Sequence, residues 1–172
     1  YTDGLKICTT INYKMQQYAE ESVWKHVGYT LQPLFERQKW NSSTYPYSDA
    51  LSPKQVQQIL ERSVRQSDRY RMMKANGCSE SEIKKAFRTK VPMSVFTYHG
   101  DVDTIMTPLD SIKYYKSFLR SGFIAIDPLN GHVKAYVGGL NYTHFQYDMC
   151  MVGRRQVGST IKPFLYALAM QD

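Results

Sequence analysis

A serine and a lysine stand three residues apart at the start of an apolar stretch near the end of the chain. The stretch reads RRQVGSTIKPFLYALAM, residues 154–170, and contains Ser159 and Lys162. A hydroxyl becomes an effective nucleophile when a nearby base removes its proton, and an uncharged lysine amine is one of the few side chains that can do so. Residues three apart on a helix share a face, so the amine can reach the hydroxyl. The spacing predicts Ser159 as a nucleophile and Lys162 as its base.

The residues around this pair favour the same chemistry. Gly158 allows the backbone to turn sharply, and the free N–H groups at a helix N-terminus stabilise a developing negative charge. The apolar run PFLYALAM is expected to exclude water from Lys162, which disfavours its charged form. The four-residue pattern is weak by itself, because a serine and a lysine at a helix start are more often a cap and a solvated charge.

Two alternating segments before this helix predict a β-hairpin. They read FIAID and HVKAYVGG and are joined by PLNG, whose Asn-Gly pair is typical of a tight turn. The sequence LNYTHFQYDMCMVG, residues 140–153, is predicted to connect the hairpin to the helix. The last third of the chain is therefore a hairpin, a loop and a helix.

The first third combines a predicted strand with a long amphipathic helix. The β-branched, alternating segment 5–11 predicts a short strand. From Asn12, a plausible N-cap, apolar residues recur at steps of three and four as far as Leu34, which predicts a helix that Pro33 kinks or ends. A loop rich in aromatic residues is expected over residues 39–53.

The middle third is predicted to be mostly helical, with one pair of strands. Ser79 and Glu82 have the spacing of a capping box, and Thr107 with Pro108 is typical of a helix start. The predicted elements are helices at 54–67 and 69–76, a helix opening at Ser79, strands in 91–100 and 103–106, and a helix from Thr107 to Gly122.

These elements predict an α+β fold in two parts. Residues 1–121 are expected to form a mostly helical module. Residues 122–172 are expected to form the hairpin and the Ser-x-x-Lys helix.

Composition limits the other functions that the chain could have. The net charge is +7, but acidic residues interrupt the basic ones, which favours a solvated basic face over a nucleic-acid site. Attraction to acidic cell-surface polymers or anionic lipid fits the charge equally well. The three cysteines and four histidines lack the spacing of metal ligands, so neither a metal nor another cofactor is predicted.

Residues 122–170 resemble the start of the transpeptidase domain of class A, bifunctional penicillin-binding proteins. In that family a strand ending in Asp-Pro, a turn with Gly and a strand ending in Val-Gly-Gly precede an Arg-Gln-x-Gly-Ser-x-x-Lys-Pro-Phe helix. The matching residues here are Asp127-Pro128, Gly131, Val137-Gly138-Gly139, Arg155-Gln156 and Gly158-Ser159 through Lys162-Pro163-Phe164. Residues 4–23 are similar to the segment that joins the family's glycosyltransferase and transpeptidase domains, and residues 100–119 are similar to the approach to the first transpeptidase strand.

The resemblance implies the fold, the activity and the roles of the two site residues. Residues 1–121 would be a linker module before the transpeptidase domain, and residues 122–172 would be the truncated start of that serine transpeptidase domain, which has the β-lactamase-like fold. Ser159 would form an acyl-enzyme with a D-alanyl-D-alanine stem peptide or a β-lactam, with Lys162 as base and the Ser159 N–H as one oxyanion donor. The parent protein would be a peptidoglycan synthase of the bacterial cell envelope, on the periplasmic side of the inner membrane. Its membrane helix and its glycosyltransferase domain would lie outside this chain.

Two further motifs of the family do not occur in the sequence. One is Ser-x-Asn, and the other is Lys-Thr-Gly, which would bind the substrate carboxylate and complete the oxyanion hole. The chain is therefore expected to be a segment of a longer protein, and to be inactive alone. Apolar surface left uncovered in such a segment is expected to promote self-association.

Two other interpretations differ in function class. Residues 1–120 show no catalytic constellation, which favours a non-enzymatic module that binds a partner or positions catalytic domains. A serine β-lactamase shares the Ser-x-x-Lys helix, but the Arg-Gln-x-Gly-Ser context and the long N-terminal part argue against it. Nucleic-acid binding is the least favoured.

Overall fold

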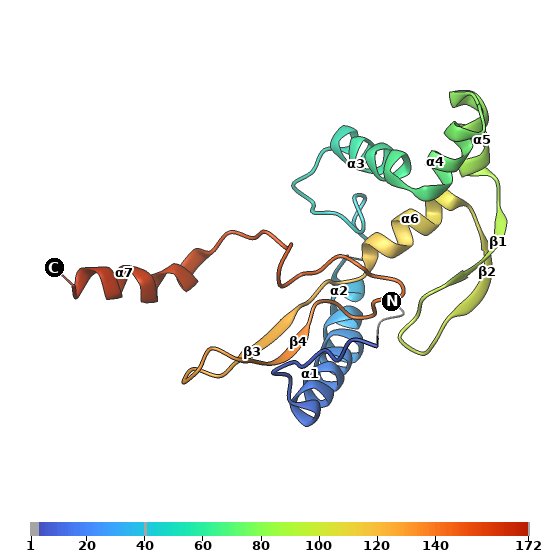
Figure 1. The fold of residues 1–172 in the computed structure, drawn as a ribbon. Helices are drawn as coiled ribbons and strands as arrows, with labels where there is room; N and C mark the ends of the chain where they lie inside the picture. Colours follow the sequence, from blue (N-terminus) through green and yellow to red (C-terminus); the bar gives the residue numbers. More distant parts are fainter. Residues whose placement is uncertain (1–3, 40, 172) are drawn as a thin grey trace. The chain divides into compact units, whose positions relative to one another are not determined.

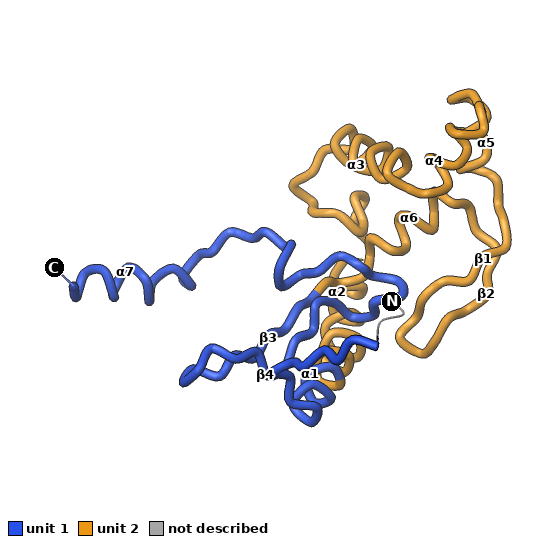
Figure 2. The backbone as a smooth tube through the Cα atoms, in the orientation of Figure 1, with its two compact units in different colours: residues 1–20, 121–172 blue, residues 21–120 orange. Residues whose placement is uncertain are grey.

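The chain divides into two compact units, coloured separately in Figure 2. The computed structural model describes residues 4–39 and 41–171, so residues 1 and 172, the outer limits of the two predicted domains, lie outside it. One unit combines the start of the chain, up to Glu20, with the residues from Ser121 onward. The other is the continuous segment Glu21–Arg120, which is inserted in sequence between the two parts of the first.

A long helical segment opens the chain and changes its hydrogen bonding in the middle (Figure 1). It consists of α1 (Tyr13–Lys25), a π-helical turn (His26–Leu31) and α2 (Gln32–Lys39). The predicted cap is confirmed, because Asn12 Oδ1 accepts a hydrogen bond of 3.1 Å from the Met15 N–H. The helix does not end at Pro33. Instead the π turn lies directly before the proline, which has no N–H to contribute to the helical ladder.

The four helices of the middle third begin after capping residues, and those of the last two, Ser79 and Thr107, are the ones that the sequence predicts. They are α3 (Pro53–Gln66), α4 (Asp68–Ala75), α5 (Glu80–Arg88) and α6 (Pro108–Ser117). The capping box is confirmed: the Glu82 N–H donates to Ser79 Oγ at 3.3 Å, and the Ser79 N–H donates to Glu82 Oε2 at 2.8 Å. Across residues 4–39 and 41–171, no helix is both long enough and apolar enough to cross a bilayer.

Two antiparallel hairpins supply the strands. One pairs β1 (Val91–Val95) with β2 (Val102–Met106), and the other pairs β3 (Phe123–Ile126) with β4 (Val133–Val137). The turn between β3 and β4 uses Gly131 at a φ of 71°. Both hairpins were predicted from the sequence and are confirmed, as is the mixture of helices with small sheets.

The predicted strand at residues 5–11 is wrong. The segment is exposed and not part of a sheet. Beside β4 it contributes a 2.7 Å bond from Thr10 Oγ1 to the Val133 carbonyl, and the neighbouring Asn12 N–H donates to the Lys134 carbonyl at 2.9 Å. One side-chain bond and one backbone bond do not make the repeated backbone hydrogen bonds of a β-ladder. The alternating pattern alone therefore does not establish a strand.

Aromatic side chains form the core of the unit 21–120. Phe96, 2% exposed, contacts Trp24, Tyr98 and Phe118, with ring centroids 5.2–5.8 Å apart in edge-on arrangements. The backbone of Gly28 lies so close to the Tyr98 ring that a Cβ there would be 2.4 Å from Tyr98 Cδ1. Burial raises the pKa of Tyr98 to about 12.

A buried glutamine connects α2 to the end of α6 in the same unit. Gln32, 3% exposed, donates from Nε2 to the Ser117 carbonyl at 3.0 Å and accepts at Oε1 from the Leu119 N–H at 2.9 Å. One side-chain amide thus satisfies two backbone groups more than 80 residues away in the chain. The unit 4–20 and 121–171 uses the same device, since Gln16 bonds both the N–H (2.7 Å) and the carbonyl (2.8 Å) of Tyr136.

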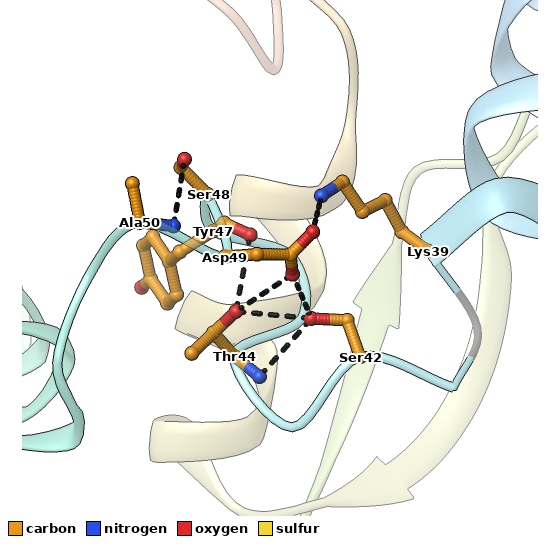
Figure 3. Close-up of polar contacts among 7 residues, drawn as sticks. All are labelled: Lys39, Ser42, Thr44, Tyr47, Ser48, Asp49 and Ala50. Carbon is orange, nitrogen blue, oxygen red and sulfur yellow. Dashed lines mark hydrogen bonds and ion pairs between the residues drawn. The ribbon is translucent and has the colours of Figure 1, made fainter.

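A polar clasp of Lys39, Ser42, Thr44 and Asp49 closes the loop after α2 (Figure 3). The Lys39 ammonium, the Ser42 hydroxyl and the Thr44 hydroxyl all donate to the Asp49 carboxylate. Chiefly because of the bonds from Lys39 and Ser42, the pKa of Asp49 falls to about 2.

Replacing Gln32 by the apolar, similarly sized methionine should destabilise the unit 21–120. Gln32→Met leaves the Ser117 carbonyl and the Leu119 N–H without their partner, at a cost of about 1–3 kcal/mol in the free energy of unfolding. Urea unfolding followed by circular dichroism measures the loss. The control is Gln38→Met, an exposed position on the same helix. Equal effects of the two variants would contradict the bridging role of Gln32.

Replacing Lys39 should raise the pKa of Asp49. The folded-state pKa of Asp49 is depressed, so the clasp contributes stability above pH ~4 and loses it as the pH falls toward 2. In Lys39→Gln the strongest donor is gone, and the carboxyl resonance of Asp49 should titrate at a higher pH by NMR. Lys54→Gln makes the same charge change outside the clasp, and it should leave the Asp49 titration where it was.

Candidate functional site

Ser159 and Lys162 occupy consecutive helical turns at the end of the chain. Ser159 lies in a 3₁₀ turn (Gly158–Ile161), and Lys162 is the first residue of α7 (Lys162–Ala169). The Lys162 N–H donates to the Ser159 carbonyl, which fixes the spacing between the two backbones. Side chains at i and i+3 of a 3₁₀ turn are eclipsed, so both start from the same face. Gly158 opens the turn at a φ of 52°, a left-handed conformation that favours glycine.

The side chains of Ser159 and Lys162 do not contact each other as a nucleophile and its base would. Both are exposed, and within the described part of the chain no hydrogen bond joins them. The apolar residues of α7 are also exposed, Phe164 by 72% and Leu168 by 60%. The predicted exclusion of water from Lys162 is therefore not provided by residues 4–39 and 41–171, and it requires apolar atoms from elsewhere.

An ordered loop connects the β3–β4 hairpin to the Ser159 turn. The Tyr136 hydroxyl, from β4, donates to Asp148 Oδ2. The other oxygen of Asp148 accepts from the N–H groups of Cys150 at 2.8 Å and Met151 at 3.0 Å, which closes the turn that leads toward Gly158. These bonds, that from Tyr136 first, lower the pKa of Asp148, and the carboxylate in return raises the pKa of Tyr136 to about 12.

Glycines let this loop pack closely on the hairpin. A Cβ at Gly138 would lie 3.2 Å from the Asp148 carboxyl carbon, and one at Gly139 would lie 3.3 Å from the Phe145 carbonyl oxygen. A Cβ at Gly122 would lie 2.7 Å from Cys150 Sγ. The Val-Gly-Gly sequence at the end of β4 thus has a local physical cause, because side chains there would push the loop away.

Sequence reasoning missed Gln16, Tyr136 and Asp148. The three hold β4 and its loop in place, and none touches Ser159. A signal was present for Asp148 alone, since an aspartate two residues before a tight turn commonly accepts from the backbone N–H groups that follow it. The contacts made by Gln16 and Tyr136 join residues 120 positions apart, and no local pattern indicates them.

Removing the Tyr136 hydroxyl should raise the pKa of Asp148. Because this pKa is depressed in the folded state, the carboxylate stabilises the loop above the ordinary aspartate range, and the contribution is lost as the pH falls through the folded value. In Tyr136→Phe the NMR titration of Asp148 should move upward. Tyr142→Phe, at a residue 80% exposed in the same loop, serves as control. An unmoved titration in Tyr136→Phe would show that the backbone donors alone set this pKa.

Comparisons with known proteins identify relatives of this chain. Residues 42–119 match the family model of the penicillin-binding protein middle domain. The chain is 46% identical over 51 residues to "Penicillin-binding protein 1A" of Vibrio cholerae, covering 30% of the chain and 6% of that protein. It is 47% identical over 56 residues to "Penicillin-binding protein 2D" of Bacillus subtilis, covering 33% and 8%.

A longer alignment covers the whole chain. It joins all of the chain to 23% of "Penicillin-binding protein 1A" of Rickettsia bellii, at 25% identity over 196 residues. The chain thus spans less than a quarter of these relatives. No solved structure matches it. The family model, the local matches and the alignment along the whole chain together support a segment of a class A penicillin-binding protein.

Proposed function

We propose that this chain is the region before the transpeptidase domain, together with the start of that domain, in a peptidoglycan synthase that cross-links stem peptides by serine acyl transfer. The observation that carries the proposal is the turn at Gly158, which puts Ser159 and Lys162 on one face at the entry to an apolar helix. The relatives named as penicillin-binding proteins support the same assignment.

The proposed reaction has two steps. Ser159 Oγ attacks the carbonyl carbon of the D-Ala-D-Ala bond while its proton passes to the uncharged Lys162 amine. The C–N bond then breaks, and the leaving D-alanine takes up a proton. In the second step an amine from another stem peptide attacks the ester and releases Ser159. A β-lactam opens its ring amide in the first step and leaves the enzyme acylated.

The proposal requires residues outside this chain. Lys162 needs apolar atoms around it to become a base, and α7 exposes its apolar side chains where a further part of the domain would cover them. The substrate carboxylate and the second oxyanion donor also need partners. In the isolated chain the same exposed surface favours self-association. The parent would act at the periplasmic side of the inner membrane, held by a helix that precedes this region.

We propose a non-catalytic role for the unit 21–120. Its polar groups serve the fold: Gln32 bridges two helices, the Asp49 clasp closes a loop, and Ser79 caps α5. The match of residues 42–119 to a middle domain supports a part that positions catalytic domains.

Labelling with a fluorescent penicillin tests the catalytic assignment. In the full-length protein, Ser159→Ala should abolish covalent labelling, because the attacking oxygen is removed. Ser121→Ala, remote in sequence from this turn, should label like the unchanged protein. The isolated 172-residue chain should not be labelled. Normal acylation of full-length Ser159→Ala would refute the role of Ser159, and stoichiometric labelling of the isolated chain would refute the need for further motifs.

A further inference from the structure

The two edges of the β3–β4 hairpin differ in how their backbone groups are used (Figure 1). On the outer side of β4, the N–H and the carbonyl of Tyr136 both bond the side chain of Gln16, so neither points toward β3. Ile124 is opposite Tyr136 in the register of the hairpin. Opposite residues of an antiparallel pair either exchange their backbone hydrogen bonds or both direct these groups outward. The N–H and the carbonyl of Ile124 therefore point away from β4.

Ile126 continues the same outer row on β3. It is opposite Val133, whose carbonyl accepts from Thr10 Oγ1 at 2.7 Å and so does not point toward β3. The N–H and the carbonyl of Ile126 therefore also point outward. In residues 4–39 and 41–171 the outward groups of Ile124 and Ile126 have no hydrogen-bond partner, and the two side chains are 41% and 54% exposed. The outer edge of β3 is thus open to a further strand.

The other strands that the structure describes carry features that protect their edges, and β3 does not. Gln16 and the Asn12 N–H cover the outer edge of β4. Pro92 in β1 has no N–H to offer, and Asp103 in β2 carries a charge. Both features disfavour the addition of another strand. The sequence of β3, FIAI, includes neither a charged residue nor a proline, so its edge is suited to pair with a further strand.

We propose that this edge pairs with the same edge of a second copy of the chain, antiparallel and centred on Ile124. Ile124 then lies opposite Ile124 of the second copy, and Gly122 lies opposite Ile126. By the alternation along the strand, all three direct their backbone groups outward, so each facing pair can exchange both of its hydrogen bonds. Gly122 has no side chain, which leaves room for Ile126. Centring on Ala125 would instead place Pro128 opposite Gly122, and a proline has no N–H to contribute.

The edge is complementary to itself in charge and in apolar surface. Because β3 carries no charge, two copies meet there without like-charge contacts, although each chain has a net charge of +7. Ile124 and Ile126 of both copies come together on one face of the joined sheet, which removes apolar side chains from water. This pairing does not depend on the acyl transfer proposed for Ser159.

The covered edge of β4 limits the size of the assembly. A twofold axis uses the same surface on both copies, so pairing through β3 consumes the open edge of each hairpin. Gln16 and Asn12 occupy the outer edge of β4, where a third copy would have to add. The pairing therefore stops at two copies.

Sedimentation velocity of the 172-residue chain, at concentrations up to millimolar, tests the proposal. The unchanged chain should pass from monomer to dimer as its concentration rises, because a short edge forms a small and weak interface. Ile124→Lys should raise the dissociation constant about tenfold or more, since like charges would lie directly opposite each other, and Ile124→Glu should do the same. Ile105→Lys is the matched control, at an exposed isoleucine of β2, and should dimerise like the unchanged chain.

Mixing the two charged variants distinguishes a specific pairing from a loss of folding. An equimolar mixture of Ile124→Lys and Ile124→Glu should form dimers, because opposite charges then face each other. Leu168→Ser removes an exposed apolar side chain of α7 and should leave the dimer unchanged.

Four results would overturn the proposal. A chain that stays monomeric at every concentration would leave the edge of β3 to a different strand. Unchanged affinity in Ile124→Lys, or an equal loss in Ile105→Lys, would place the contact elsewhere. A mixture of the charged variants that stays monomeric would exclude the facing of Ile124 with its own copy. Loss of the dimer in Leu168→Ser would assign the association to α7.

Discussion

Two glutamine amides carry the long-range order of this chain. An amide side chain carries both a donor and an acceptor, so it can accept a hydrogen bond from a backbone N–H and donate one to a backbone carbonyl at the same time. Gln16 does this for Tyr136, and Gln32 does it for Ser117 and Leu119. Each fixes a helix against a segment far along the chain, and each prevents backbone groups from losing water without a new partner.

The contact between Gln16 and Tyr136 begins a series of hydrogen bonds that leads to the Ser159 turn. Gln16 holds β4, Tyr136 of β4 holds Asp148, and Asp148 closes the turn that leads to Gly158. Each link is a short hydrogen bond, and glycines at the crossing points keep the backbones close. What this series does not provide is a dry environment for Lys162. The approach to the proposed catalytic turn is ordered, while the apolar side chains of α7 stay exposed among the described residues.

Local rules account for what the sequence predicted well. Helix caps and tight turns depend on residues a few positions apart, so they can be predicted from the sequence. Examples are the caps Asn12 and Ser79 and the turn at Gly131. The pair Ser159 and Lys162 was visible for the same reason. The segment 5–11 was misread because alternation does not reveal whether a neighbouring strand completes the ladder.

Contacts between distant residues were not predictable from one sequence. Gln16 and Gln32 look like ordinary polar positions of a helix, and their partners lie 85 to 120 residues away. The exposure of Lys162 is also a tertiary property, which its sequence neighbours suggested wrongly for this part of the chain.

The division of the chain has a consequence for its synthesis on the ribosome. The first unit needs both its early residues and the β3–β4 hairpin, while the whole unit 21–120 is translated between them. At about 5–20 residues per second, the early segment waits on the order of 6–24 s for Tyr136 to be made. The unit 21–120 therefore has time to fold before the β3–β4 hairpin is made and the first unit can form.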